Sequence, residues 1–414
     1  MDKLVIPEGY KQTEVGVIPE EWDLQLFSKL TDTITCGVAA TPDYVAESVG
    51  KPFLSAQNVR KGKVDYTKHN FISAPLFEQL TKHNKPKKRD ILYTRVGAGI
   101  GEAAVIPDNF EFAIYVSLTL IKVKHGVLNP YFTAHLLNSD KFRFLAKNGQ
   151  FAGGGVQNLN VEVVRSFLIP LPPYNEQTAI ANALSDVDAL IAELEKLIAK
   201  KQAIKTATMQ QLLTGRTRLP EFANYPDGTP KGYKQTELGE IPEGWNVISL
   251  GDVMSIRHGK NQKQVEAING KYPILATGGQ IGWADSYIYD KPSVLIGRKG
   301  TIDKPRYAET PFWTVDTLFY SEIDSIADPK FIFYKFCMVD WMQYNEASGV
   351  PSLNAATIEK VLATVPSKVE QTVIANILSD MDKEIHSLQQ RFDKTRRIKQ
   401  GMMQELLTGK TRLV

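Results

Sequence analysis

Cysteine is nearly absent from this chain, which has two among 414 residues, Cys36 and Cys337. Two thiols are too few for a disulfide framework, and neither lies near a group of histidines that could complete a zinc site. We therefore expect both to be buried free thiols in a reducing cytoplasm.

Long hydrophobic runs are missing too. No apolar stretch approaches the roughly 20 residues that span a bilayer, and the N-terminal sequence MDKLVIPEGY lacks the pattern of a signal peptide. There is also no large surplus of one charge, because 49 Lys and Arg against 46 Asp and Glu leave a net charge of +3. We expect a cytoplasmic protein with no membrane partner, in which local groups of basic residues would have to bind any polyanion.

Catalytic motifs are absent or incomplete. FAGGG at 151–155 and LPPY at 171–174 resemble parts of a methyltransferase, but Leu171 cannot accept the protons of an amino group. The two motifs are also too close together for the βαβ units of a nucleotide-binding fold. The single D-x-K, at 328–330, lacks the further carboxylate that a Mg²⁺ nuclease needs, and no ATP-binding phosphate loop occurs. We therefore predict no catalytic residue and no metal ligand.

Internal repetition is the strongest feature that is present. GYKQTEVGVIPEEW at 9–22 returns as GYKQTELGEIPEGW at 232–245, with eleven of fourteen residues identical and an offset of 232 − 9 = 223. Two further segments return with an offset of 370 − 176 = 194: EQTAIANALSDVDALI (176–191, repeated at 370–385) and QLLTGRTRL (211–219, repeated at 405–413). The chain thus has a pseudo-two-fold repeat, in which each half joins a repeated frame to a variable body.

The repeats predict five segments. They are a conserved N-terminal segment (1–22), a first body (23–170), a central region with a long helix and a linker (171–245), a second body (246–366) and a C-terminal helix (367–414).

The frames are predicted to be long helices, over 175–214 and 369–408. Apolar residues alternate at spacings of four and three, which is a heptad seam. The seams are Ile180, Leu184, Val187, Ile191, Leu194 and Ile198 in the first helix, and Ile374, Leu378, Met381, Ile385, Leu388 and Phe392 in the second. Because the seams match, we expect the helices to pair as an antiparallel coiled coil. The alternative is that each helix packs only on its own body.

An antiparallel pair would bring the two ends of the chain together. The C-terminal LTGKTRLV would then lie next to the phrase at 9–22, just as LTGRTRL, which ends the first helix, leads into the phrase at 232–245. The phrase that precedes each body would then be a clamp between body and helix, with Trp22 and Trp245 as packing anchors. The second helix is expected to begin at a capping box formed by Ser367 and Glu370.

Each body combines β-rich runs with later helical stretches, which predicts α+β domains. Their polar loops are the expected DNA-binding surface, since Arg and Lys bind phosphates and guanine edges, and Asn and Gln can bond to adenine. The alternative for such loops is a solvated surface. The candidates are Gln57, Asn58, Arg60, Lys61, Lys87, Lys88, Arg95, Gln157 and Asn158 in the first body, and Lys260, Lys263, Arg298, Lys299, Ser352 and Asn354 in the second.

Matched positions in the two bodies are expected to be framework, because bodies that recognise different sequences must differ where they choose bases. Arg95 and Arg298 are matched, so we expect them to hold a turn or a phosphate. Gln157 and Asn158 face different residues in the second half, and we expect them to discriminate between bases.

The doubled motifs resemble those of the specificity (S) subunit of type I restriction–modification systems. The resemblance covers essentially the whole chain and rests on GYKQTE-x-G-x-IPE-x-W, the PLPPY-x-EQ segment with its partner at 365–382, LLTG-[RK]-TRL, and an R-x-G in each body. It implies two target recognition domains separated by an antiparallel two-helix coiled coil, each domain recognising one half of a bipartite DNA site. It also implies a subunit without catalysis or cofactor of its own.

Partners follow from the same resemblance. They would be double-stranded DNA, two modification subunits that carry S-adenosylmethionine, and restriction subunits with an ATP- and Mg²⁺-dependent motor. Two alternatives stay open: an adaptor whose bodies bind proteins, and a self-contained restriction–methylation enzyme, against which the missing catalytic motifs count.

Overall fold

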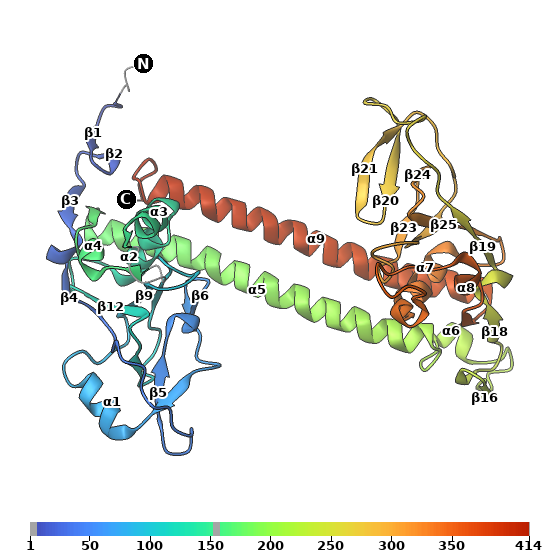
Figure 1. Cartoon of the computed structure of the whole chain (residues 1–414), viewed down its shortest axis with the longest axis horizontal. Coiled ribbons are helices and arrows are strands. Elements are labelled where there is room, and N and C mark those ends of the chain that lie inside the picture. Colours follow the sequence, from blue (N-terminus) through green and yellow to red (C-terminus); the bar gives the residue numbers. More distant parts are fainter. Residues whose placement is uncertain (1–5, 152–157, 414) are drawn as a thin grey trace. The chain divides into compact units, whose positions relative to one another are not determined.

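The computed structural model describes residues 6–151 and 158–413 and separates into two compact units. Unit 1 comprises residues 1–194 and 391–414, and unit 2 comprises residues 195–390. Two long helices, α5 (Tyr174–Leu213) and α9 (Lys368–Leu406), each contribute one part to each unit (Figure 1). No helix of the described ranges is long and apolar enough to cross a membrane.

The body of unit 1 contains two sheets. The larger is antiparallel, in the order β10–β9–β12–β4 (Ala103–Val105, Ile91–Thr94, Leu118–Val123, Thr31–Cys36). The smaller has the order β11–β5–β8 (Ala113–Ile114, Lys51–Leu54, Asn70–Ile72), with β11 parallel to β5. The central strand β9, ILYT, is buried at every position, which suits its apolar and aromatic residues.

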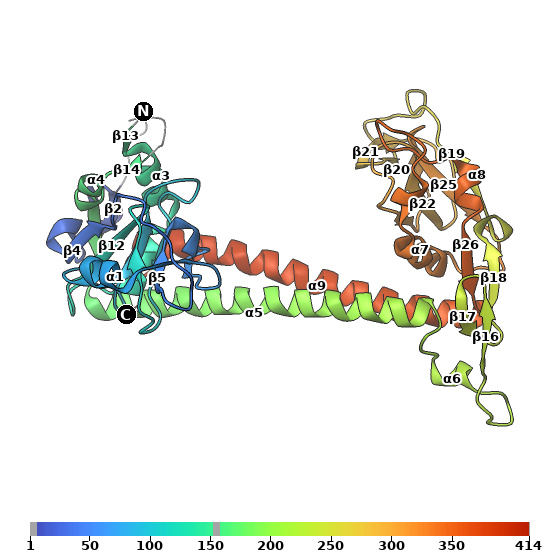
Figure 2. The same ribbon diagram turned by 60° about the horizontal axis from the view of Figure 1, so that its bottom comes forward.

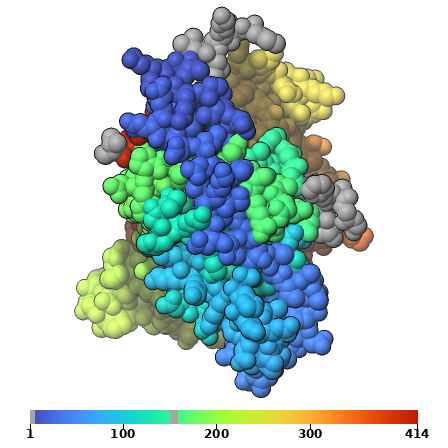
Figure 3. Space-filling view, turned by 90° about the vertical axis from the view of Figure 1, so that its left-hand side faces the viewer, coloured from blue at the N-terminus to red at the C-terminus, as the bar shows by residue number. Residues whose placement is uncertain are grey.

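Short elements complete unit 1. The helices are α1 (Ala74–Thr81), α2 (Pro130–Leu137), α3 (Asp140–Asn148), α4 (Val161–Arg165) and the 3₁₀ turns η1 (Phe27–Lys29) and η2 (Ala56–Asn58). The paired strands are β1 with β2 (Tyr10–Thr13, Gly16–Pro19), β3 with β15 (Asp23–Leu26, Leu168–Leu171), β6 with β7 (Val59–Arg60, Lys63–Val64) and β13 with β14 (Gln150–Phe151, Asn158–Leu159). Figure 3 shows the dark blue residues of the N-terminal hairpin at one end of a face of this unit, and the light blue residues around α1 at the other.

Unit 2 repeats the topology. Its larger sheet has the order β19–β25–β22–β23 (Met254–His258, Leu318–Ile323, Ser293–Gly297, Arg306–Ala308) and its smaller sheet the order β21–β20–β24 (Gly279–Ala284, Tyr272–Ala276, Trp313–Thr314). The remaining elements are β16 and β17 (Tyr233–Thr236, Gly239–Pro242), β18 and β26 (Asn246–Ser249, Leu362–Val365), α6 (Pro220–Ala223), α7 (Pro329–Met338), α8 (Ala355–Glu359), η3 (Leu250–Asp252) and η4 (Trp341–Tyr344). The α+β prediction is confirmed in both units.

The long helices pack together along the predicted seams, in antiparallel directions. In unit 1, Ile180 and Leu184 are buried in one core with Leu406. The end of α9 accordingly lies beside the start of α5 in both ribbon views (Figures 1 and 2). In unit 2, Ile374 and Leu378 share a core with Leu212 and Leu213 at the end of α5. An ion pair joins Asp188 to Lys399 (2.7 Å) in unit 1, and another joins Lys201 to Glu384 (2.7 Å) in unit 2. The helix pairing is therefore confirmed.

Two smaller expectations need correction. The cysteines are free, but Cys36 is half-buried and Cys337 is exposed, because Cys337 lies beyond Phe336, the last buried residue of α7. The capping box is half present: the Glu370 amide donates to Ser367 Oγ (3.4 Å), whereas the Glu370 carboxylate turns away to other partners.

Candidate nucleic-acid interface

Loops that are far apart in sequence gather at one edge of the larger sheet of unit 1. Thr94 at the end of β9 pairs with Leu118 at the start of β12, so Arg95 and Ser117 leave the sheet at the same edge. The Arg95 amide donates to the Ser117 carbonyl (3.0 Å), and the Ala56 amide donates to Ser117 Oγ (2.9 Å). Ser117 thus brings η2, with candidates Gln57 and Asn58, beside Arg95.

Arg95 joins two of these loops. Its side chain is buried, and its Nε donates to the carbonyl of Leu159 (2.9 Å), whose amide donates back to the Arg95 carbonyl (2.9 Å). Nearby, Gly97 has φ +86°, a conformation that favours glycine. These contacts give Arg95 a role in holding the loop before α4 in place, with its charge at the edge of the sheet.

The turn between β6 and β7 reaches the same edge. Glu102 accepts from the Gly62 amide through its carboxylate (2.9 Å) and from the Thr94 amide through its carbonyl (2.8 Å). Arg60 and Lys61 are exposed on this turn, and Arg60 Nε donates to the Gln57 carbonyl (2.9 Å).

Asn58 differs from its exposed neighbour Gln57. It is 1% exposed, and its Oδ1 accepts from the Ser55 amide (3.0 Å) while Nδ2 donates to the carbonyls of Asp65 (2.8 Å) and Lys68 (2.7 Å). Its amide group therefore builds the loop that presents Gln57.

Three other candidates of this body lie elsewhere. Lys87 and Lys88 are exposed just before β9 begins, at the end of that strand opposite to Arg95. Asn158 is half-buried and bridges to Val96 through the backbone, which places it at the Arg95 edge. Gln157 lies outside the described residues.

Unit 2 gathers matching loops. The Arg298 amide donates to the Thr317 carbonyl (2.8 Å), and the Leu353 amide donates to the Arg298 carbonyl (3.0 Å). Lys299 and Ser352 form a bridge, so these candidates lie together at the end of β22. Arg298 is half-buried, whereas Lys299 is exposed.

The remaining candidates of unit 2 flank this edge. The Lys260 amide donates to the Thr314 carbonyl (2.8 Å), shortly after β19 ends beside the start of β25. Lys263 follows on the same exposed loop. Asn354 is exposed, and its Oδ1 caps α8 by accepting from the Ala356 amide (3.0 Å).

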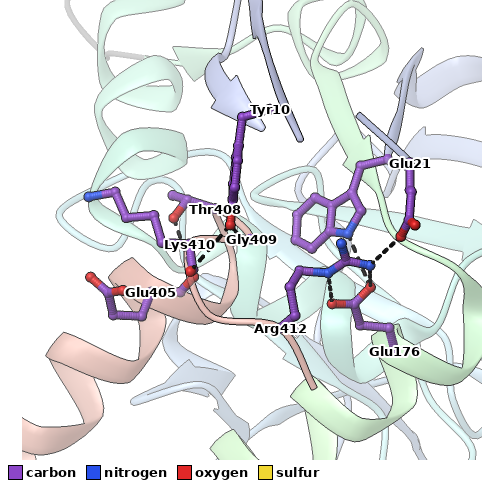
Figure 4. Close-up of polar contacts among 9 residues, drawn as sticks. Tyr10, Glu21, Glu176, Glu405, Thr408, Gly409, Lys410 and Arg412 are labelled. Carbon is purple, nitrogen blue, oxygen red and sulfur yellow. Dashed lines mark hydrogen bonds and ion pairs between the residues drawn. The ribbon is translucent and has the colours of Figure 1, made fainter. Parts of the chain in front are cut away.

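The repeated frames meet in a cluster that we call clamp 1, formed by Trp22, Glu176 and Arg412. The buried indole of Trp22 donates to Glu176 Oε2 (3.1 Å), and Arg412 donates to both oxygens of that carboxylate (2.6 and 2.9 Å) (Figure 4). Arg412 also pairs with Glu21 (2.9 Å), and Tyr10 donates to the Gly409 carbonyl (3.0 Å). The C-terminal segment is therefore bound to the N-terminal phrase at the start of α5.

Clamp 2, formed by Trp245, Glu370 and Arg218, reproduces this arrangement in unit 2. Trp245 donates to Glu370 Oε1 (3.3 Å), and Arg218 binds both carboxylate oxygens (3.1 and 2.9 Å). Tyr233 donates to the Gly215 carbonyl (3.2 Å), as Tyr10 does to that of Gly409. The predicted packing role of Trp22 and Trp245 is confirmed. The C-terminal segment contacts the phrase at 9–22 in the same way that the segment after α5 contacts the phrase at 232–245.

Motif reasoning did not single out Glu176, Arg218 or Arg412, and it singled out Glu370 only as a helix-capping residue. They were identifiable in principle, because Glu176 and Glu370 and also Arg218 and Arg412 occupy matched places in the repeats (412 − 218 = 194). Nothing local marks them, since each contact joins segments more than 100 positions apart.

A second matched joint fixes each body to its helix. Gln177 accepts from the Asn129 amide (2.8 Å) in unit 1, and Gln371 accepts from the Asp328 amide (2.9 Å) in unit 2. Asn129 and Asp328 each cap the following helix. The orientation of a body at its helix thus depends on frame residues.

Residues 44–206 and 242–394 match the model of the type I restriction modification DNA specificity domain, and together they cover more than half of the chain. The chain belongs to this family. It is a DNA specificity subunit of a type I restriction–modification system, with a role in recognition and not in catalysis. Among the described residues, no group of three His, Cys, Asp or Glu is placed to hold a metal ion.

Two specificity subunits of Methanocaldococcus jannaschii are similar to this S subunit over nearly their full lengths. One, described as a putative MjaX specificity subunit, is 26% identical, with 98% of this chain and 97% of the relative covered. The other, the MjaVIII specificity subunit, is 23% identical, with 98% and 96% covered.

Solved structures share the fold of this S subunit. The S subunit of a type I restriction–modification system from M. genitalium superposes with a TM-score of 0.64 at 18% identity, covering 93% of this chain and 96% of that one. A second chain, from a structure that describes complex assembly and conformational transition of the type I R-M system, superposes with a TM-score of 0.51 at 16% identity. The superposition covers 95% of this chain and 99% of that one.

Proposed function

We propose that each body recognises one half of a split DNA target and that α5 and α9 set the distance between the halves. The bodies would comprise residues 23–170 and 246–366. The observation that carries this proposal is the repeated topology: two sheets with the same strand order, each with a loop cluster at the same edge and each joined to the helices by the same clamp.

The spacing argument is geometric. DNA advances about 34 Å per turn, so two recognition surfaces held at a constant separation select half-sites at a constant number of base pairs. A pair of regular helices suits this role, because an α-helix lengthens by about 1.5 Å per residue and resists bending when its seam is buried.

The exposed candidates at the sheet edges would supply the DNA contacts. In the first body these are Gln57, Arg60 and Lys61, with Arg95 behind them. In the second they are Lys260, Lys263 and Lys299, with Arg298 at half burial. Lys87 and Lys88 lie at the opposite end of β9 and would contact a phosphate outside the half-site.

Partners would complete the activity. We infer that the S subunit acts in the cytoplasm, without a membrane partner, on double-stranded DNA together with two modification subunits and with restriction subunits. S-adenosylmethionine, ATP and Mg²⁺ would be bound by those subunits. The net charge of +3 agrees with this division, because partners would share the binding of the DNA backbone.

Methylation mapping tests the proposal. DNA from cells that carry this chain with its cognate modification subunit should show a split motif with a constant gap, lost when the chain is deleted. A continuous motif, or no change in methylation when the chain is deleted, would contradict the proposal and favour the adaptor alternative. That alternative also predicts no steep loss of DNA binding as salt rises, whereas phosphate contacts require one.

A further inference from the structure

The two bodies differ where the central strand of the smaller sheet ends. KPFL of β5 (51–54) matches YPIL of β20 (272–275) with an offset of 272 − 51 = 221, and each of these strands is central in its sheet. The same offset places Gly278 where body 1 has Gln57, since 278 − 57 = 221. Body 2 therefore has no side chain at the position from which body 1 presents Gln57.

Gly278 lies in the turn of the hairpin formed by β20 and β21 (yellow in Figure 1) and is exposed. This turn reaches the edge at which Arg298 leaves the larger sheet, because a Cβ on Gly297 would lie 3.1 Å from Cγ2 of Thr277. A Cβ on Gly278 would meet no atom of the described residues within 4 Å. The tip of this hairpin is thus bare backbone that faces open space, which allows a ligand to approach closely.

An arginine of the larger sheet lies beside this tip. A Cβ on Gly279 would lie 3.5 Å from Nη1 of Arg306, which belongs to β23 and is half-buried. Within the described ranges, the Arg306 side chain makes no ion pair and no hydrogen bond. Its five N–H donors are therefore available to an acceptor from outside the chain.

The equivalent position in body 1 is closed. Arg306 pairs with Leu295. The residue of body 1 that matches Leu295 is Leu92, since 295 − 92 = 203, and it pairs with Ala104. Ala104 is fully buried in one core with Val59 of β6. Body 1 inserts β6 and β7 between β5 and β8, whereas β20 leads directly into β21, which leaves Arg306 partly exposed.

We propose that Arg306 recognises a guanine of the second half-site across the glycine tip, and so takes the place that Gln57 has in body 1. The inference rests on the proposed function, because it assigns one base contact to body 2. Arginine suits this contact, since its guanidinium can donate two hydrogen bonds to O6 and N7 of guanine in the major groove. Arg306 also differs from its matched residue Ala104, as a residue that chooses a base in one body only must differ.

Removal of the Arg306 side chain tests the assignment in the complex with the cognate modification subunit. In methylation mapping, Arg306→Ala should relax one G·C position of the second half-site and leave the first half-site and the gap unchanged. In anisotropy competition between duplexes that differ at that position, the preference for guanine should fall by about 5- to 150-fold. Lys271→Ala is the matched control, because it removes the same charge from an exposed residue at the opposite end of β20 and should change neither result.

Gly278→Leu tests the tip without a change of charge. The added side chain meets open space in the chain itself, so the Tm should stay unchanged. Binding of the second half-site should be lost, because the leucine occupies the space that the base edge needs. Binding of the first half-site, retained in the same variant, shows that the chain is folded.

Three results would overturn the assignment. One is a second half-site that contains no guanine, and another is an Arg306→Ala variant that binds all sequences equally more weakly, as loss of a phosphate contact would cause. The third is unchanged binding of the second half-site by Gly278→Leu. A failure of the proposed function looks different, because the unaltered chain would then produce no split motif at all.

Discussion

Arg412 holds Glu176 in a two-pronged hydrogen-bonded ion pair across 236 positions of sequence, with donor–acceptor distances of 2.6 and 2.9 Å. Glu176 is almost fully buried, and the indole of Trp22 donates to the same carboxylate (3.1 Å). Removing one partner of a buried pair leaves an uncompensated charge, which is more destabilising than the pair is stabilising.

We predict that Arg218→Ala lowers the free energy of unfolding of unit 2 by about 3–5 kcal/mol. Arg412→Ala should have a smaller effect on unit 1, because the Arg412 side chain is 24% exposed and that of Arg218 is 9% exposed. Urea unfolding followed by tryptophan fluorescence measures both. Lys383→Ala, which breaks an exposed pair with Asp380, is the control and should change nothing measurable. Equal effects of all three variants would contradict the clamps.

Neighbouring residues of η2 should respond in opposite ways. Asn58→Ala removes three hydrogen bonds from a buried loop and should destabilise unit 1 by about 1–3 kcal/mol. Gln57→Ala should leave stability unchanged and weaken binding of the first half-site, because Gln57 is exposed at the Arg95 edge. Thermal unfolding and fluorescence anisotropy with duplex DNA separate the two effects. Weakened DNA binding by Asn58→Ala at unchanged stability would refute this assignment.

Unit 1 should lose stability in mild acid through His135. Burial first, and the charge of Lys399 second, lower the pKa of this imidazole to about 4, although Asp188 lies 4.0 Å away and opposes the shift. The unfolded chain takes up the proton near pH 6.5, so between pH 6.5 and 4 the unfolded state holds more protons. Stability therefore falls as pH falls through this window, by up to about 3 kcal/mol.

His135→Tyr is the matched test, because Tyr334 occupies the equivalent place in unit 2 and donates to Asp382 (2.7 Å). This variant should flatten the dependence of unfolding free energy on pH between 6.5 and 4. An unchanged slope in urea unfolding across that range would assign the acid sensitivity to other groups.

Lengthening both long helices together should lengthen the gap between half-sites. Seven residues inserted after Lys200 in α5 and seven after Ile385 in α9 preserve the heptad pairing near the Lys201–Glu384 ion pair. Each helix grows by about 10.5 Å, which corresponds to about three base pairs. Methylation mapping should show the original half-sites with a longer gap. Insertion of seven residues after Asp227, in the exposed linker turn, should leave the gap unchanged.

Much of the frame was predictable from sequence. The heptad seam indicates a buried helix face by spacing alone, and the two matched seams indicate mutual pairing. The repetition of the phrase around Trp22 and Trp245 is by itself enough to predict a structural joint. The partners of these tryptophans were not predictable, because the pairing of a carboxylate with an arginine 236 positions away leaves no local pattern.

The recognition surface was predictable in composition but not in arrangement. Gln57 and Asn58 have similar side chains and adjacent positions, but Gln57 is exposed and Asn58 is buried. Asn58 is buried because its amide group donates to the carbonyls of Asp65 and Lys68, and no periodicity in the sequence predicts those contacts. The parallel pairing of β11 with β5 likewise joins strands about 60 positions apart, which strand propensity cannot foresee. The exposure of Cys337, which follows the last buried residue of α7, was likewise not revealed by local hydrophobicity.

The matched joints also bear on how such a gene changes. In both units a body is attached through frame residues: the clamp tryptophan, the clamp carboxylate, and the glutamine at position 177 or 371. Closely similar residue stretches, GYKQTE-x-G-x-IPE-x-W before each body and EQ-x-x-IA after it, flank each body, so an exchange of one body for another within these stretches keeps the attachment residues. The incoming segment inherits a complete set of attachment contacts, and a new target preference can arise in one step without compensating substitutions.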